Sequence, residues 1–433
     1  MMKTMETFHK ETVHGQTAKL VAIADDITGA FDTGVQFSKR GASVKVVTGD
    51  HMVDAMMQAD VLVIDAETRH LTPQEAYQKT RELAAWALER GATYFYVKTD
   101  SGLRGNIGVA IKAVLDATGI LLAAFAPAYP DMNRITLNGQ QFINGIPIQD
   151  SVFGQDEFEP VLAPTISGLI KPFGLDVMEC PLDMGYDTVV TRPTVAVFDT
   201  RTNEDFSRIA AHLKAENQLT VTAGCAAFAA MLAGPLELPD CVKPAPVVIP
   251  PLLVICGSLN PITRKQMEYC EKMGGHRVVL SSDQLLDDGF LDSASGHSWI
   301  AGLLPAMRKH KTLLLDTGLR PLKTVGDIVE GEGLRKHEAS LRIARQMGRV
   351  LERLLEMKES EAYTPMIIGG DTLMGYLALQ EALDLELEGE VTTGVVAFRF
   401  KGKSHPIQML SKSGGFGNVT LLSDVLSKDK MVR

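Results

Sequence analysis

Short apolar runs alternate along this chain with longer segments whose apolar residues recur at helical spacing. Runs without polar alternation are typical of strands that are buried on both faces of a parallel sheet. They fall into two sets, the first at Leu20–Ala24, Val44–Val47, Val61–Asp65, Tyr94–Lys98 and Leu121–Ala126, and the second at Leu252–Cys256, Arg277–Leu280, Thr312–Asp316, Met366–Ile368 and Val395–Phe400. This rhythm predicts an α/β fold of two domains, each with its own mostly parallel sheet flanked by helices.

The length of 433 residues also favours two domains, because a single hydrophobic core rarely serves a chain this long. Residues 235–251 carry six prolines, which forbid a regular helix and favour extended chain. We therefore expect a polar leader at 1–19, an N-terminal domain at 20–234, a linker at 235–251 and a C-terminal domain at 252–433. Two further runs, Val195–Phe198 and Leu219–Thr222, are expected to complete the first sheet, whereas the segment 140–190 follows no assignable pattern.

The formal net charge of −10 argues against the large basic surface that nucleic-acid binding requires. The five cysteines form no Cys-x-x-Cys pair and are odd in number, so we expect reduced, buried thiols rather than a metal site or disulfides. The first residues lack the apolar core of a signal peptide, and no stretch reaches the length of a membrane span. We expect a cytoplasmic protein without nucleic-acid or membrane partners, and a homodimer as the default assembly.

Polar residues directly after the apolar runs are the first candidates for function, because ligands of open α/β sheets bind beyond the carboxyl ends of the strands. The first run ends in ADDITGAFDTG (24–34), where Asp25 and Asp26 precede a turn of small residues. Asp32 lies about two helical turns further on from Asp25. A helix cap needs one such side chain, so three carboxylates here indicate a binding or catalytic role.

Basic residues follow the next strands of the first set. The third run ends in DAETR, where the planar fork of Arg69 can bind a carboxylate with two hydrogen bonds, although a surface ion pair with Glu67 explains the motif equally well. The fourth run ends in KTDSGLRGN, which gathers Lys98, Asp100, Ser101 and Arg104. The fifth ends in APAYPDMNRITLNG, which adds Asn133 and Arg134. Four basic residues on neighbouring loops of an acidic chain predict a pocket for a small anion.

Three glycine-rich turns follow strands of the second set: CGSLNPITRKQ (256–266), IIGGDT (367–372) and SKSGGFGN (411–418). Turns of this kind can hold phosphate through free backbone N–H groups. Asp371 is available to a nucleotide or to Mg²⁺, and Lys412 and Ser413 are candidate phosphate contacts. No P-loop, no GxGxxG after a first strand, no HExxH and no GxSxG motif occurs. The three turns therefore predict a nucleotide site of another type.

In content and order, these motifs resemble those of the four-carbon acid sugar kinase family: ADDITGAFDTG, DAETR, KTDSGLRGN, APAYPDMNRITLNG, CGSLNPITRKQ, GGDT and KSGGFG. The resemblance implies an N-terminal domain that binds the sugar acid, a C-terminal domain that binds ATP, and phosphate transfer across the cleft between them. It assigns the substrate to Asp25, Arg69, Lys98, Thr99, Asp100 and Ser101. It assigns ATP to Ser258, Gly369, Gly370, Asp371, Thr372 and Gly414.

The substrate follows from differences within that family. Members that act on 3-oxo-tetronates look different, with an opening motif closer to ADDFTGATDIA and a later motif that contains a cysteine and STFDST. This chain has DTGVQFSKRG and KTDSGLRGN instead, which is similar to the D-threonate and D-erythronate kinases. We therefore predict phosphorylation of the terminal hydroxyl, O4, of one of these two acids. The alternatives are a 3-oxo-tetronate 4-kinase and a non-catalytic sensor of sugar acids or nucleotides.

Phosphoryl transfer also requires charge neutralisation by Mg²⁺ and a carboxylate that accepts the hydroxyl proton. We expect Arg69 and Lys98 to anchor the carboxylate and hydroxyls of the substrate. Asp25 or Asp100 is the expected base near the attacking O4. The sequence identifies no set of metal ligands.

Overall fold

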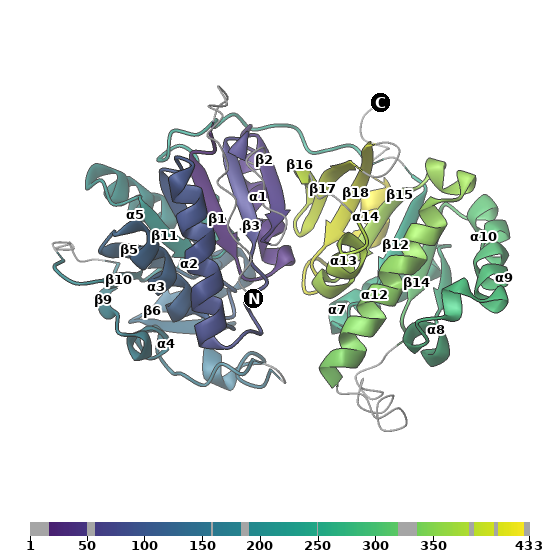
Figure 1. Cartoon of the computed structure of the whole chain (residues 1–433), viewed down its shortest axis with the longest axis horizontal. Helices are drawn as coiled ribbons and strands as arrows, with labels where there is room; N and C mark the ends of the chain where they lie inside the picture. The colour runs from purple at the N-terminus through teal and green to yellow at the C-terminus, as the bar shows by residue number, and fades with distance from the viewer. Residues whose placement is uncertain are drawn as a thin grey trace, which may run out of the picture.

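The computed structural model describes residues 17–49, 57–156, 159–182, 190–248, 250–318, 336–380, 385–401 and 406–427. Residues 1–16 of the predicted polar leader lie outside this description. The described residues form an α/β protein with a mostly parallel mixed sheet that is flanked by helices (Figure 1). Among them, no helix is both long enough and apolar enough to cross a membrane.

The first half of the chain builds eight adjacent strands that are all parallel to their neighbours. In spatial order they are β2 (Val44–Thr48), β3 (Val61–Asp65), β1 (Leu20–Ala24), β4 (Tyr94–Lys98), β11 (Val221–Gly224), β5 (Leu122–Ala126), β10 (Thr194–Phe198) and β9 (Asp176–Cys180). The predicted apolar runs of this half are confirmed to within two residues at each end. Apart from the edge strand β9, which is partly exposed, these strands place their side chains alternately on two buried faces.

The second half of the chain builds seven strands, of which three run antiparallel to a neighbour. In spatial order they are β13 (His276–Val279), β14 (Thr312–Asp316), β12 (Leu252–Cys256), β15 (Thr364–Ile368), β18 (Pro406–Lys412), β17 (Val395–Lys401) and β16 (Leu385–Thr392). β12, β15 and β18 are neighbours and parallel, so the turns that follow them lie at one edge of the sheet.

The prediction of two separate sheets is wrong, because the two halves share one sheet of 15 strands. The join is an antiparallel pairing of β16 with β2, where Leu385 pairs with Val46 and Glu386 with Lys45. β2 is the outermost strand of the first half, and its free backbone groups would otherwise face solvent. The pairing covers these two residue pairs and makes the sheet continuous from one half into the other.

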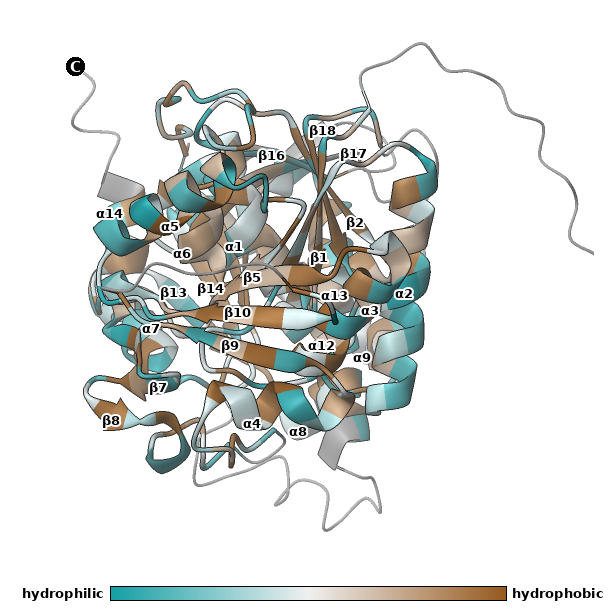
Figure 2. Ribbon diagram, turned by 90° about the vertical axis from the view of Figure 1, so that its left-hand side faces the viewer, coloured by the Kyte–Doolittle hydropathy of each residue, from teal (hydrophilic) through white to brown (hydrophobic). Residues whose placement is uncertain are grey.

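Helices cover both faces of the shared sheet (Figure 1). On the first half, α2 (Pro73–Glu89) and α3 (Ile107–Thr118) pack on one face, and α1 (Ile27–Ser38), α5 (Asn203–Ala215) and α6 (Ala226–Ala229) pack on the other. On the second half the helices are α7 (Pro261–Lys272), α8 (Ser282–Leu286), α9 (Ala294–Gly302), α10 (Leu304–Lys309), α12 (Lys336–Leu355), α13 (Gly370–Leu377) and α14 (Leu421–Ser427). Figure 2 shows hydrophobic strands inside and hydrophilic outer faces on α2 and α3.

Helix α1 packs against strands of both halves. Phe31 lies edge-on to Phe398 of β17, with ring centroids 4.9 Å apart. Gly34 lies so close to Leu387 of β16 that an added Cβ would be 2.6 Å from its Cδ1. The glycine therefore permits the close approach of α1 to the strand that joins the halves.

The unassigned segment 140–190 contributes to the rim of the first half. Together with Arg134–Leu137 (β6), it forms a small three-stranded sheet from β7 (Gln140–Ile143) and β8 (Ile146–Pro147). It continues into α4 (Ile166–Ile170) and the edge strand β9. Its residues 157–158 and 183–189 lie outside the described part of the chain.

In the proline-rich segment 235–251, residues 235–237 end a turn, and the described residues after them run without helix from one half of the molecule to the other (Figure 1). Asp240 forms an isolated bridge with Gly41, and its carboxylate accepts a hydrogen bond from Arg40 Nη1 at 2.5 Å. The segment is thus attached to the end of α1. The domain boundaries that we place around it stay predictions.

We expect Phe31→Ala to destabilise the fold by about 3–5 kcal/mol, because it removes a buried ring from the contact between the halves. Urea unfolding measures the change, and a double-mutant cycle with Phe398→Ala should show a coupling of about 0.5–1.5 kcal/mol for the aromatic pair. Leu88→Ala, on a side chain that is 40% exposed, is the control and should change stability by less than about 0.5 kcal/mol. A loss below about 1 kcal/mol for Phe31→Ala would contradict this role for α1.

Candidate functional site

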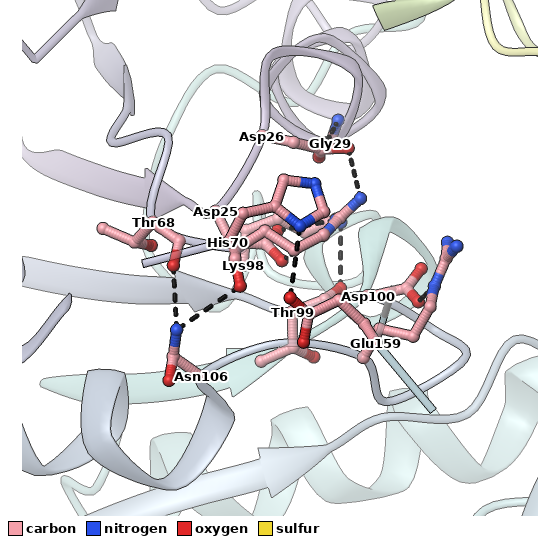
Figure 3. Close-up of polar contacts among 12 residues, drawn as sticks. Asp25, Asp26, Gly29, Thr68, His70, Lys98, Thr99, Asp100, Asn106 and Glu159 are labelled. Atoms are coloured by element: carbon pink, nitrogen blue, oxygen red, sulfur yellow. Dashed lines mark hydrogen bonds and ion pairs between the residues drawn. The ribbon is translucent and has the colours of Figure 1, made fainter. Parts of the chain in front are cut away.

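The candidate site lies at the carboxyl ends of three neighbouring parallel strands, β3, β1 and β4. Ala24 at the end of β1 pairs with Asp65 on one side and with Lys98 on the other. The loops that follow these strands therefore emerge side by side. Figure 3 shows how Asp25, Asp26, Lys98 and Asp100 gather from these loops.

Arg69 binds two carboxylates of its own chain. Its Nε and Nη2 donate to the two oxygens of Asp25 at 2.8 and 3.0 Å, and its Nη1 donates to Asp26 at 2.7 Å. The surface pair with Glu67 is thus not formed, and the bidentate clamp is formed with Asp25. Asn106 supports this loop by donating to the carbonyls of Thr68 and Leu71, both at 2.9 Å.

The pKa values of the two carboxylates that share Arg69 are shifted in opposite directions. Burial raises the pKa of Asp25, although Arg69 works against this shift. Burial also opposes ionisation of Asp26, but Arg69, Lys98 and the N–H of Gly29 outweigh it and lower the pKa of Asp26. Asp26 also caps α1 by accepting from Gly29 N at 2.8 Å.

Asp100 is held in a second ion-paired group. Arg104 donates from Nε to Asp100 at 2.6 Å and from Nη1 to Asp156 at 3.0 Å. Burial opposes ionisation of Asp100, but Arg104 and then Arg69 overcome it and hold its pKa well below the usual range. Asp100 is therefore an ionised, firmly bound carboxylate with little tendency to take up a proton.

Lys98, Thr99 and Ser101 occupy different positions relative to the candidate site. Lys98 is buried and its Nζ donates to the carbonyl of Thr99 at 2.9 Å. A Cβ on Gly29 would lie 2.7 Å from that Nζ, so the glycine makes room for the ammonium group beside α1. Ser101 Oγ accepts from Arg134 Nη1. Lys98 and Ser101 line the pocket described next, whereas Thr99 and Asp25 are not among its lining residues.

A pocket of about 540 Å³ collects these side chains. Its cationic lining consists of Arg69, Lys98, Arg104 and Arg134, and its other polar lining includes Asp26, Asp32, Asp100, Tyr129 and Asn144. On the opposite side it is lined by residues of the second half, Asn260, Ser413, Gly415 and Phe416. The rings of Tyr129 and Phe416 approach to 6.3 Å across it. The pocket is thus shared between the two halves of the chain.

Arg134, like Lys98, has no carboxylate partner among the described residues. Its guanidinium lies over the ring of Phe153 at 4.9 Å, and Arg104 lies over the same ring at 5.2 Å. Burial lowers the pKa of Arg134. A half-buried guanidinium whose hydrogen-bond partner is a hydroxyl is electrostatically ready to receive an anion.

The three glycine-rich turns converge at the ends of β12, β15 and β18. A Cβ on Gly414 would lie 2.4 Å from Ser258 Oγ, and a Cβ on Gly257 would lie 2.1 Å from Thr372 Oγ1. Gly369 has a positive φ of 111°, and α13 begins directly after it. The first N–H groups of α13 therefore lie among the predicted nucleotide residues Ser258, Gly369, Gly370, Asp371, Thr372 and Gly414.

Lys412 supports the third turn from within the protein. It is 1% exposed, and its Nζ donates to the carbonyl of Ser413 at 2.9 Å and to that of Gly414 at 3.4 Å. Burial lowers the pKa of Lys412 to about 8. Thr263 Oγ1 donates to the same Gly414 carbonyl at 2.6 Å. In this structure the ammonium group of Lys412 holds the turn, and the prediction that Lys412 and Ser413 contact phosphate stays a prediction.

The structure adds residues that sequence reasoning did not single out, namely Tyr129, Asn144, Phe153, Asn260 and Phe416. Asp32 was noticed only as a member of an acidic cluster. Asp32 follows Thr28 by four positions, and residues four apart share one face of a helix. This spacing was the signal that could have placed Asp32 in the pocket beside Thr28.

No group of three or more His, Cys, Asp or Glu side chains is arranged to hold a metal ion in the described ranges. Asp371 is exposed at the start of α13, beside the glycine turns. Mg²⁺ in phosphoryl-transfer sites is commonly bound by one or two carboxylates together with phosphate oxygens. A single carboxylate at this turn is compatible with that arrangement.

Two family models match the chain. Residues 20–232 match a sugar-binding N-terminal domain, and residues 253–422 match a nucleotide-binding C-terminal domain. A D-threonate kinase of Cupriavidus necator is 32% identical over 68% of this chain and 74% of its own length. The chain belongs to the four-carbon acid sugar kinase family. Membership confirms the predicted enzyme class, a sugar-acid kinase with a nucleotide-binding C-terminal half.

Other members of the family are more distant. A D-erythronate kinase of Heliobacterium modesticaldum is 25% identical over 93% of this chain and 94% of its own length. A 3-oxo-tetronate kinase of Brucella melitensis is 23% identical over 92% of this chain and 93% of its own length. A solved structure from Salmonella typhimurium LT2 has a TM-score of 0.74 at 17% identity and covers 95% of this chain and 99% of that chain, which shows the shared fold.

We expect Gly414→Ala to weaken nucleotide binding by this kinase about tenfold or more, because the new methyl group displaces Ser258 Oγ from the turn. Calorimetric titration with ADP measures the change. The matched control is Gly302→Ala in α9, where an added Cβ meets no atom within 4 Å. An unchanged ADP affinity in Gly414→Ala would remove this turn from the nucleotide site.

Proposed function

We propose that this kinase transfers the γ-phosphoryl group of ATP to the terminal hydroxyl, O4, of D-threonate or D-erythronate. One observation carries the proposal: four cationic side chains and a glycine-rich turn from the other half of the chain line a single pocket. The cations suit a small carboxylate, and the turn suits a nucleotide phosphate. The pocket between the halves is therefore our candidate for the active-site cleft.

The carboxylate of the substrate is best received by Arg134 with help from Lys98. Arg69 donates two N–H groups to Asp25 and a third to Asp26. It therefore has only part of its hydrogen-bond donors left for a substrate. We propose that Arg69 orders Asp25 and Asp26 and offers its remaining N–H groups to the substrate. Ser101 then contributes through its contact with Arg134.

The pocket offers several carboxylates as hydrogen-bond acceptors to the hydroxyl groups of the substrate. Asp26, Asp32 and Asp100 all line the pocket. A hydroxyl at C3 can donate to such acceptors, whereas a ketone only accepts. This supports a trihydroxy acid over a 3-oxo acid. Asp100 is a poor proton acceptor because its ion pair lowers its pKa, and Asp25 has both oxygens bound by Arg69 and does not line the pocket.

The nucleotide side of the proposal rests on the three turns. We assign ATP to Ser258, Gly369, Gly370, Asp371, Thr372 and Gly414, where small residues let phosphate approach the backbone. Asp371 would hold Mg²⁺ together with phosphate oxygens, and the ion would neutralise charge on the transferring group. Cytoplasmic location and a homodimer stay predictions from the sequence.

We expect Mg-ATP turnover with D-threonate or D-erythronate to be at least about tenfold more efficient than with either 3-oxo-tetronate, because a ketone leaves a buried acceptor unpaired at a cost of about 1–3 kcal/mol. Coupled ADP release with the four acids gives kcat/KM for each. Preference for a 3-oxo acid would refute the assignment of D-threonate or D-erythronate as substrate, but the enzyme would still be a sugar-acid kinase. Tight binding of an acid without ADP release would instead indicate a sensor.

We expect Arg134→Gln to raise the KM for the sugar acid about ten- to hundredfold, because the variant loses a charge-assisted hydrogen bond to the carboxylate of the substrate. It should also reduce the preference of the kinase for the acid over the corresponding tetritol, which lacks the carboxylate. Steady-state kinetics on both substrates measure this preference. Arg201→Gln, on an exposed side chain outside the pocket, is the control. An acid KM within twofold of wild type would place the carboxylate elsewhere.

A further inference from the structure

We propose that Asp32 is the general base that takes the proton from the attacking hydroxyl of the sugar acid. The inference rests on the proposed function, since it assigns a residue to that reaction. It departs from the sequence-based assignment of Asp25 or Asp100. Three structural observations carry it: the position of Asp32 in the pocket, its lack of a partner, and the engagement of the competing carboxylates.

Asp32 lies where the acceptor must meet the nucleotide. It is on α1, one helical turn beyond Thr28, and residues four apart share one face of a helix. Thr28 lies against the start of α13, since a Cβ on Gly370 would be 2.4 Å from Thr28 Oγ1. Asp32 and Thr28 line the same pocket as Ser413 and the other residues of the third turn. The carboxylate is thus next to the boundary between the substrate wall and the phosphate turns.

The other carboxylates of the pocket region are already bound. Asp25 receives two hydrogen bonds from Arg69, and Asp26 receives one from Arg69 and one from Gly29 N. Asp100 pairs with Arg104, as does Asp156, which also accepts from Glu159 N at 3.0 Å. Protonating any of them would require an existing ion pair to weaken.

Asp32 has no hydrogen-bond or ion-pair partner for its carboxylate within the described part of the chain. The charged and titratable groups that face it are Lys98 from β4, Asp26 at the start of α1, Glu390 from β16 and Tyr129 after β5. Burial raises the pKa of Asp32 to about 7, with Lys98 lowering it and Asp26 and Glu390 raising it. A base that titrates near neutral pH is well matched to proton abstraction at that pH.

The proposed step balances in atoms and charge. The O–H bond of the acceptor breaks and its proton passes to the Asp32 carboxylate, while the hydroxyl oxygen forms a bond to the γ-phosphorus of ATP. The bond from that phosphorus to the bridging oxygen breaks, and its electron pair leaves on ADP. Lys98, which lines the same pocket and acts electrostatically on Asp32, helps to neutralise the developing charge. The proton returns to solvent when the phosphorylated acid leaves.

The test is Asp32→Asn, which keeps the shape of the side chain and removes the basic oxygen. We expect kcat to fall about 10²–10⁴-fold, the usual contribution of a general base, with the KM for the acid changed less than about threefold. Wild-type kcat should rise tenfold per pH unit below about pH 7 and level off above it, because only the ionised carboxylate accepts a proton. The residual activity of Asp32→Asn should lack this rise of kcat with pH below about pH 7, which we call the acid limb.

Stability distinguishes loss of the base from loss of the fold. Because the folded state raises the pKa of Asp32 from 3.8 to about 7, the carboxylate reduces stability progressively as the pH rises between these two values, and the full cost persists above pH 7. Replacement by Asn removes that cost. The Tm of Asp32→Asn at pH 8 should therefore be no lower than that of wild type. Asp131→Asn, an exposed carboxylate outside the pocket, is the matched control and should keep both wild-type kcat and the acid limb.

The outcomes separate the two proposals. A wild-type enzyme that phosphorylates no four-carbon acid refutes the proposed function, together with the acceptor to which Asp32 is assigned. Robust wild-type turnover with an unchanged kcat in Asp32→Asn, or with the same acid limb in that variant, overturns only the role of Asp32. Loss of the acid limb in Asp26→Asn but not in Asp32→Asn would move the base to Asp26.

Discussion

The packing of α1 between the two halves is the constraint on which the rest of the site depends. Its hydrophobic side carries Phe31 against β17, and Gly34 brings the helix close to β16. Its N-cap Asp26 and, within the helix, Gly29 and Asp32 line the pocket. Because one rigid helix does both, the join between the halves and the distance from the substrate wall to the phosphate turns are set together.

The distribution of charge within the pocket gives its residues different tasks. One guanidinium, Arg69, serves two carboxylates, and another, Arg104, serves two more. These closed groups use up most of their hydrogen-bonding capacity within the protein, so they rigidify the loops after β3 and β4. Arg134, Lys98 and Asp32 lie outside both groups. An unpaired cation and an unpaired carboxylate in one pocket are suited to opposite ends of a hydroxy acid.

The elements that sequence reasoning predicted are those whose side-chain pattern has few alternatives. A short, wholly apolar run such as Leu20–Ala24 is compatible with a doubly buried strand and with little else. The segment LELEGEVT of β16 was not predicted, because its alternating leucines and glutamates also suit an exposed surface segment. Its pairing with β2 through two residue pairs left no periodic signal, so the single sheet was not foreseen.

The sequence by itself determined the fold class, the turns that carry polar side chains and the family, because these depend on local pattern and motif order. Only the tertiary structure decided which charges neutralise one another. Arg69 meets Asp25 across 44 positions of the chain, and no local rule chooses that partner over Glu67 two residues away. The pKa of Asp32 was likewise beyond the sequence, because it arises from burial between α1, β4 and β16, elements that lie up to hundreds of residues apart in the chain.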